Sequence, residues 1–175
     1  MAVLNQTQNK NYLAEVGFRF IIQKLPNTEY FVQQTNIPAI THTPVLHPNP
    51  LTNQMVVPGE RLGYDGLVLN FRIDEDMTNY IEIHDWLTSI TSVDDQTRFE
   101  AATDQGTIRG LNSSIYSDAT LMVLSSNNNP IVRVNFQDCM PLNLSTIQFD
   151  VTQQDIAYLE GTVEFAYRRY TIEKI

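Results

Sequence analysis

The chain has 175 residues, 42% hydrophobic and 18% charged, a composition that fits a globular domain with a sizeable core and excludes a disordered chain. Its 20 acidic and 11 basic residues give a net charge of −9, which argues against nucleic-acid binding because such proteins concentrate Lys and Arg against phosphates. The single cysteine, Cys139, excludes an intramolecular disulfide and therefore a disulfide-stapled secreted scaffold.

The N-terminal residues are polar and carry neither the basic region nor the apolar region of a secretion signal. We expect residues 1–15 to form a flexible arm and residues 16–175 to form a single domain. No apolar run reaches the roughly 18 to 20 residues that a membrane-spanning helix needs, so the sequence predicts no membrane contact.

The first structured region is predicted to be a β-hairpin. Apolar and polar residues alternate from Val16 to Gln23, which is typical of a strand with one apolar face. A turn at Leu25–Thr28 then separates this strand from a second one over residues 29–34.

Residues 38–63 contain five of the eight prolines. Because proline has no backbone N–H, an internal sheet strand is not expected in the first half of this segment. Extended segments of this length are uncommon in compact domains unless they have a function. Two interpretations stay open, a disordered surface loop and an arm that lies on a neighbouring subunit. The second would cover the apolar residues of the segment, which are Val45, Leu46, Leu51, Met55, Val56 and Val57.

The clearest strand is predicted over residues 67–74, where one apolar face would carry Leu67, Leu69, Phe71 and Ile73. In the last predicted strand, over residues 159–170, Val163 and Phe165 would share such a face. The first of these strands leads into a helix that should end near Thr91 or Ser92. Asn79 is the predicted N-cap, because Glu82 follows it three residues later in a variant of the capping box. The apolar stripe of this helix consists of Ile83, Trp86, Leu87 and Ile90.

The second half of the chain is predicted to be mostly β. Residues 92–116 show no clear pattern, and we assign them no role. Strands are expected at residues 119–124, 131–136, 147–151 and 159–170, the first two joined as a hairpin by a turn at 127–130. Strands, one helix and more strands favour a mainly antiparallel β-sandwich or barrel that carries one packed α-helix.

No residue pattern predicts catalysis, a metal or a cofactor. His42 and His47 lie close together, but a zinc site needs three or four ligands and no other His or Cys is near. The run Asp74–Asp76 fits charge at a helix N-terminus better than a pair of catalytic carboxylates. Nucleophile elbows, phosphate loops and dinucleotide fingerprints are missing from the sequence. We therefore expect a protein that is not an enzyme.

A carbohydrate-binding module for host recognition is the alternative from a different class of function. Such a module needs aromatic side chains exposed around a groove. Trp86 is the only tryptophan, and its place on the helix stripe predicts a core residue instead.

Several short motifs, in this order, resemble the tail-tube and tail-tube-initiator proteins of contractile-tailed bacteriophages. The similarity extends over roughly residues 17–168, and the motifs that carry it are Val57–Tyr64, Leu69–Asp74, Asn79-Tyr80, Asp85–Leu87, Phe136–Pro141 and Phe165–Arg168. The resemblance implies a structural virion protein whose sandwich-like domain forms hexameric rings that stack into a tube. It does not distinguish the main tube from the initiator rings near the baseplate.

The resemblance also implies partners. Copies of the chain would join each other, sheath and baseplate proteins would adjoin the tube, and DNA would pass through the channel without specific binding. Such a protein is assembled in the host cytoplasm and ends in the phage tail.

Site residues follow from the same resemblance. Contacts between subunits would be made by the arm, through its six apolar residues together with Arg61 and Tyr64. An acidic channel wall would repel DNA, and the candidate residues for it are Asp65, Asp74 and Glu164.

Overall fold

The computed structural model describes residues 11–48, 55–91, 115–152 and 157–175, and its fold is mainly antiparallel β with one α-helix, as predicted. In chain order the elements are β1 (Phe18–Ile22), the short 3₁₀ helix η1 (Glu29–Phe31), β2 (Val32–Thr35), β3 (Ile40–His42), β4 (Val45–His47), β5 (Met55–Val57), β6 (Leu62–Tyr64), β7 (Leu67–Arg72), α1 (Thr78–Thr91), β8 (Ser117–Leu124), β9 (Pro130–Leu144), β10 (Glu160–Ala166) and β11 (Arg169–Lys174).

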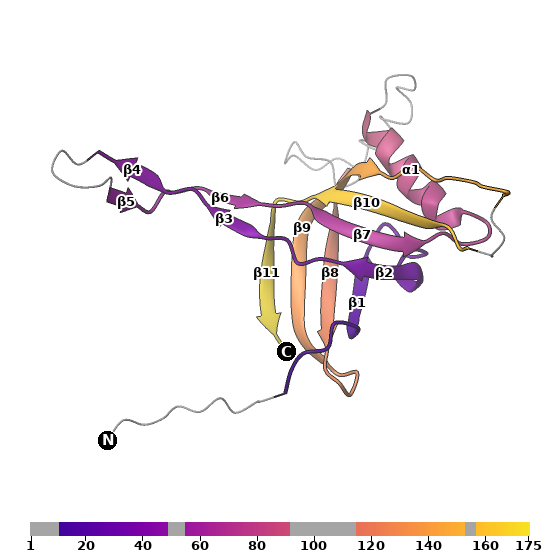
Figure 1. Cartoon of the computed structure of the whole chain (residues 1–175), viewed down its shortest axis with the longest axis horizontal. Helices are drawn as coiled ribbons and strands as arrows, with labels where there is room; N and C mark the ends of the chain where they lie inside the picture. Colours follow the sequence, from indigo (N-terminus) through magenta and orange to yellow (C-terminus); the bar gives the residue numbers. More distant parts are fainter. Residues whose placement is uncertain (1–10, 49–54, 92–114, 153–156) are drawn as a thin grey trace.

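The body of the protein is a folded sheet with two halves that share β9. In the β8 half-sheet the strand order is β1-β8-β9-β11, and in the β7 half-sheet it is β9-β10-β7-β2. All of these pairings are antiparallel. Figure 1 shows the strands of the β8 half-sheet running across the direction of β7 and β10.

A corner in the backbone separates the two halves. Within β9, Asp138 has a positive φ of 56°, and opposite it the chain changes from β10 to β11 at Tyr167 and Arg168. The corner is closed by a hydrogen bond from Arg168 N to Gln137 O (2.9 Å) and an ion pair between Arg168 and Asp138 (3.2 Å). A residue in the left-handed region re-aims a strand, so β9 can turn from one half-sheet into the other.

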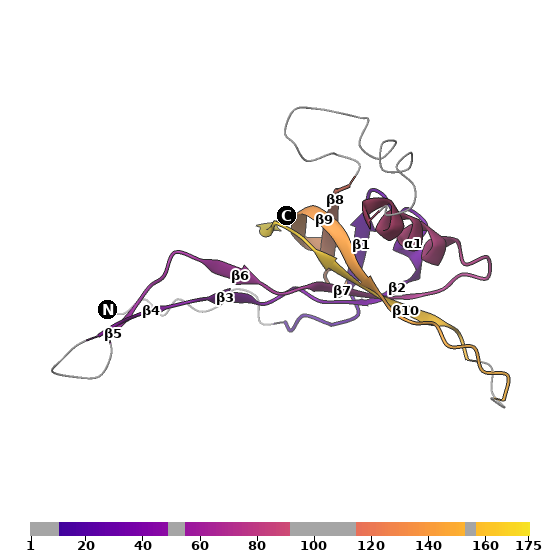
Figure 2. The ribbon, with the colours of Figure 1, turned by 90° about the horizontal axis from the view of Figure 1, so that it is seen from above.

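The hydrophobic core lies between the two half-sheets and α1. Figure 2 shows α1 on the same side of the β7 half-sheet as β1 and β8. The predicted apolar faces are confirmed, because Leu67, Leu69 and Phe71 of β7 and Val163 and Phe165 of β10 are all buried. From the predicted helix stripe, Ile83 and Trp86 are buried in this core, and Ile90 packs partly against it.

The start of α1 differs from the predicted capping box. Asn79 is fully buried inside the helix, where its side-chain amide donates a hydrogen bond to Arg72 O (2.8 Å). The capping group is Asp74, whose carboxylate accepts a hydrogen bond from the Asn79 backbone N–H (3.2 Å). Asp74 therefore supplies the negative charge at the helix N-terminus, and Glu82 instead accepts a hydrogen bond from the Asn27 amide.

The predicted hairpin of the first two strands is wrong. β1 pairs with β8 and β2 pairs with β7, so the two strands belong to different half-sheets. Between them, successive turns anchored by the buried residues Leu25 and Thr28 lead into η1. These turns rotate the chain away from β1, and residues 29–31 form 3₁₀ helix instead of strand.

Two predictions in the C-terminal region also need correction. Residues 147–151 form no strand, and Phe149 and Val151 are 73% and 99% exposed, because this segment leaves the sheet and has no core to face. The predicted strand over residues 159–170 is divided into β10 and β11 by the corner. The hairpin of β8 and β9 around residues 127–130 is confirmed, although β9 is much longer than predicted.

Several predictions lie outside the described residues, namely most of the N-terminal arm, the region 92–114 and Leu51. In the part of the chain that is described, no helix has the length and apolar character needed to cross a membrane.

Gly161 in β10 leaves room for the buried ring of Phe71 in β7. Gly161 lies opposite Phe71, and a Cβ atom at position 161 would come within 2.8 Å of Phe71 Cζ. We predict that Gly161→Ala lowers the free energy of unfolding by about 1–3 kcal/mol, because the buried ring cannot move aside. Gly66→Ala is the matched control, since its Cβ would meet only the movable carboxylate of Glu164. Urea unfolding of unassembled subunits measures the free energy of unfolding of both variants. An equal loss of stability in Gly161→Ala and Gly66→Ala would contradict the prediction.

Burial raises the pKa of the Cys139 thiol from 9.0 to about 12, with the nearby Asp118 and Asp138 charges acting in the same direction. Between these values the unfolded chain loses the thiol proton and the folded chain keeps it. Stability should therefore fall as pH rises from 9 toward 12, by at most about 1.4 kcal/mol per pH unit from this group. Urea unfolding across this range should show a shallower pH slope for Cys139→Ala than for the natural chain, whatever cavity cost the variant carries. If the free energy of unfolding has the same pH slope in both chains, the thiol of Cys139 does not cause the loss of stability.

Candidate subunit-contact surfaces

Residues 38–48 and 55–64 form a two-stranded ribbon that projects from the body, and we call it the arm (Figure 1). β3 pairs with β6 near the body, and β4 pairs with β5 further out. Strands do form among the prolines, but only as two short ladders and not as part of the main sheet. Of the two open interpretations, the described part of the segment fits an extended arm and not a disordered loop.

Close backbone contacts explain the arm's glycines. A Cβ atom at Gly59 would overlap the Thr43 carbonyl, and one at Gly63 would lie 2.6 Å from Thr41 Oγ1. The His42 ring also bonds across the ribbon, with Nε2 at 2.8 Å from Gly59 O. Its role is therefore structural, and the described residues contain no group of three or more His, Cys, Asp or Glu side chains placed to hold a metal.

The predicted contact residues of the arm are brought together on one exposed ribbon. Five apolar ones are 37% to 63% exposed, namely Val45, Leu46, Met55, Val56 and Val57. Arg61 is exposed as well, whereas Tyr64 is half-buried and packs on the body of its own chain. An exposed apolar surface of this kind is typical of a protein interface.

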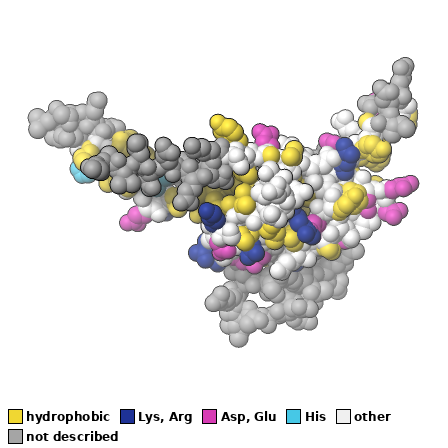
Figure 3. Space-filling view, turned by 90° about the horizontal axis from the view of Figure 1, so that it is seen from below, with side chains coloured by type: hydrophobic (Ala, Val, Ile, Leu, Met, Phe, Trp, Pro, Cys, Tyr) yellow, Lys and Arg dark blue, Asp and Glu magenta, His cyan; other side chains and the backbone are white. Residues whose placement is uncertain are grey.

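A second exposed apolar surface lies on the opposite side of the body and was missed by the sequence analysis. The described residues 145–152 and 157–159 extend away from the sheet, and Figure 2 shows this protrusion pointing away from the arm. It exposes Phe149, Val151 and Tyr158. Figure 3 shows hydrophobic side chains on both projections, one at each end of the molecule. The signal available in the sequence was that Phe149 and Val151 are apolar but lie in a segment for which no partner strand could be named.

A third surface is a groove of about 700 Å³ where the two half-sheets do not join. Among the described residues, β1 and β2 each have one neighbour in the sheet and one free edge, and residues of both strands line the groove. Its lining is largely apolar and includes Leu13, Val16, Ile37, Leu121 and Val123. The sequence did not indicate it because it depends on the unexpected separation of β1 from β2.

The three acidic candidates for a channel wall do not form one cluster. Asp65 is exposed at the root of the arm, and Glu164 of β10 lies nearby over Gly66. Asp74 follows the far end of β7 and is engaged at the start of α1. Glu164 shares the outer face of the β7 half-sheet with Asn70 and Thr162, whose side chains are joined by a hydrogen bond of 2.8 Å.

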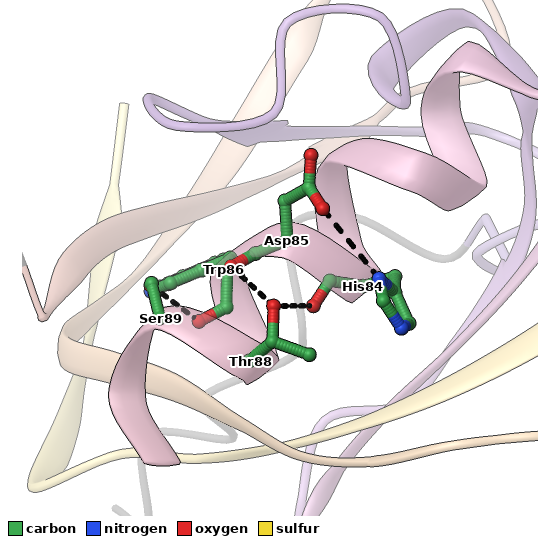
Figure 4. A network of polar contacts seen from close by, with 5 residues as sticks. All are labelled: His84, Asp85, Trp86, Thr88 and Ser89. Carbon is green, nitrogen blue, oxygen red and sulfur yellow. Dashed lines mark hydrogen bonds and ion pairs between the residues drawn. The ribbon is translucent and has the colours of Figure 1, made fainter. Parts of the chain in front are cut away.

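The outer side of α1 carries polar groups that bond to the helix itself (Figure 4). The Thr88 hydroxyl donates to His84 O (3.0 Å) and lies 3.1 Å from Asp85 O, and the Ser89 hydroxyl donates to Trp86 O (2.7 Å). Trp86 itself is buried, and its indole N–H donates to Ile115 O (2.9 Å). It is a core residue and not a platform for sugar binding, as its position on the helix stripe predicted.

Similar solved structures share this fold at low sequence identity. A chain of the tube-terminating cap of the anti-feeding prophage is 16% identical, with a TM-score of 0.63 over 100% of both chains. A chain of the sheath–tube complex of an extracellular contractile injection system, PVC, is 15% identical, with a TM-score of 0.60 over 95% of this chain and 94% of that chain. A chain of the anti-feeding prophage baseplate is 13% identical, with a TM-score of 0.60 over 89% and 90%. No curated protein sequence matches the chain.

The family described as phage tail tube protein matches residues 3–173, which is nearly the whole chain. The match includes both halves of the sheet, the arm and the helix. By this match, together with the shared fold, the chain belongs to the phage tail tube protein family.

Proposed function

We propose that this protein forms hexameric rings that stack into the tube of a contractile phage tail, through which DNA passes. It acts either as the main tube subunit or as the initiator of the tube near the baseplate. Sheath and baseplate proteins are its further partners, and assembly takes place in the host cytoplasm. A member of this family is a structural component of the phage tail. Beyond that, we propose the number of subunits in a ring, the neighbouring proteins and the passage of DNA.

The exposed apolar arm carries the proposal. Apolar side chains on both strands of its outer ladder remain accessible in the isolated subunit. An isolated two-stranded ribbon is only marginally stable in water, and burial of its apolar side chains against another copy would stabilise both the ribbon and the contact. The second apolar projection, at the other end of the body, gives each subunit a further surface for a neighbour.

Ring number and neighbours rest on the structures that share the fold. The baseplate structure of the anti-feeding prophage is described as six-fold symmetrised, which supports a hexamer for a subunit of the same fold. The PVC structure is described as a complex of sheath and tube, which supports a sheath partner. Permanent ring contacts should bury more than the roughly 1,600 Å² of a standard protein interface.

The channel proposal concerns electrostatics. The net charge of −9 makes the subunit repel a polyanion. Glu164 lies over Gly66, the residue that follows Asp65 at the arm root, and we propose that both carboxylates contribute to the channel wall. Asp74 stays a weaker candidate because its carboxylate already accepts a hydrogen bond at the helix start. DNA meeting an acidic wall would slide, because the carboxylates repel its phosphates.

The arm contact is tested with a charged cross-strand pair. Leu46 and Val56 lie directly opposite each other in the ribbon. In Leu46→Lys/Val56→Glu the opposite charges should keep the ribbon paired while the exposed apolar pair on one of its faces is removed. We expect the variant to fold, with an unfolding free energy within about 0.5 kcal/mol of the natural chain, and to form no tubes in electron micrographs.

The matched control for this variant is Leu46→Val/Val56→Leu, which keeps the apolar surface and should still form tubes. Tubes of the charged variant at the same protein concentration as the natural chain would refute the role of the arm.

The channel wall is tested by charge reversal. Tubes of Asp65→Lys/Glu164→Lys should retain duplex DNA that is protected from nuclease at low salt and released at high salt, because lysines in the wall would bind phosphates. The control Glu75→Lys/Asp76→Lys adds equal charge at two exposed positions before α1. The channel assignment fails if the control protects DNA equally, or if neither variant does.

A further inference from the structure

Aromatic side chains hold the root of the arm, where its two strands leave the body. The entering strand passes Pro38, which is buried, and the returning strand reaches the body at Asp65. Asp65 N donates a hydrogen bond to Ala39 O (3.1 Å), which ties the two strands together at this point. Beyond it, the arm is a narrow ribbon with no third strand in the described residues.

Each of the two strands is tied to the body by one tyrosine hydroxyl. Tyr167 OH donates to the carbonyl of Asp65 (2.9 Å), and Tyr170 OH donates to the carbonyl of Pro38 (3.0 Å). Proline has no N–H, so the ribbon is short of backbone donors at its root. The two phenols supply donors there.

The rings of these two tyrosines also pack against the arm. Tyr64, the last residue of β6, packs edge-on against Tyr167 and Tyr170, with ring centroids 5.9 Å and 5.7 Å away. Both tyrosine rings rest in turn on the fully buried Phe136, at 5.2 Å and 5.6 Å. Aromatic pairs at such distances are stabilising beyond the area they bury.

The two tyrosines come from the corner of the sheet and the strand that follows it. Tyr167 lies in the corner between β10 and β11, and Tyr170 is the second residue of β11. The corner is fixed by the pairing of Arg168 with Asp138 and by the long strand β9. The phenol of Tyr167 carries its proton at neutral pH in any case, and burial raises its pKa further, to about 12.

We propose that Tyr167 and Tyr170 are positioning residues that fix the direction of the arm in the free subunit, so that its apolar surface is already aimed at the neighbouring copy. This inference rests on the proposed role of the arm in assembly. An arm that swings freely would lose conformational entropy on contact, and a fixed arm has lost that entropy on folding. Removal of the two hydroxyls should therefore weaken assembly without unfolding the body.

The test variant is Tyr167→Phe/Tyr170→Phe, which keeps both rings and removes both hydrogen bonds. Spin labels on Leu62→Cys in the arm and Glu173→Cys in β11 report the arm-to-body distance by double electron–electron resonance in unassembled subunits. Cys139 is fully buried and stays unlabelled. We expect a narrow distance distribution in the otherwise natural chain and a broad one in the double variant.

The second measurement is the critical concentration for tube formation by unlabelled protein. It should rise roughly tenfold in the double variant, the effect of losing two modest hydrogen bonds from a preorganised arm. Tyr12→Phe/Tyr30→Phe, at tyrosines that are 99% and 88% exposed, is the matched control and should change neither measurement. A label pair within the body, Gln23→Cys and Glu173→Cys, should give the same distance in every variant, which verifies the fold.

An unchanged arm-to-body distribution would overturn the positioning role. A broadened distribution with an unchanged critical concentration would overturn its link to assembly. The arm's own part in assembly is judged separately by Leu46→Lys/Val56→Glu, since tubes of that variant would refute the proposed function whatever the tyrosine variants do.

Discussion

Strand β9 pairs with β8 and β11 over its first part and with β10 over its last part, so one strand carries both half-sheets. The bend at Asp138 sets the angle between the halves, and the space they enclose is filled by Phe136 and Phe165 together with the apolar side of α1. The same bend displaces β10 from β11 and places Tyr167 and Tyr170 against Phe136, with their hydroxyls at the root of the arm. Core packing and the root of the arm thus depend on one local change of backbone direction.

In this arrangement the body buries its own apolar side chains, whereas the projections leave theirs exposed to solvent. In the body the apolar faces of β7, β10 and α1 are covered by one another. In the arm, the opposite protrusion and the groove beside β1, apolar side chains are accessible to solvent in the single subunit. Apolar surface at several separate places suits a protein that is surrounded by neighbours, and it fits the family to which the chain belongs.

The sequence was most informative where one local period decides the structure. The alternation in β7 and the stripe of Ile83 and Trp86 predicted buried faces correctly, because burial repeats at the period of the element. It was least informative about pairing between distant strands. β2 follows β1 closely but pairs with β7, a choice made by the turns around Leu25 and by contacts across the whole chain. The corner at Asp138 depends on a backbone conformation that no residue pattern predicts, so the tyrosine contacts built on it could not be foreseen. For residues 38–63 the sequence left a surface loop and an arm both open, because the prolines disfavour a place inside the sheet while the apolar residues still need to be covered.

The arm is not one continuous ladder. β3 and β6 pair near the body and β4 and β5 pair further out, and between the two ladders the strands pass through Pro44 and Pro58, which donate no backbone hydrogen bond. Across this break the two strands stay in contact, because the His42 ring lies 2.8 Å from the carbonyl of Gly59. The direction set by the tyrosines at the root is thereby passed along the ribbon to the exposed apolar side chains of β4 and β5, far from the body that determines it.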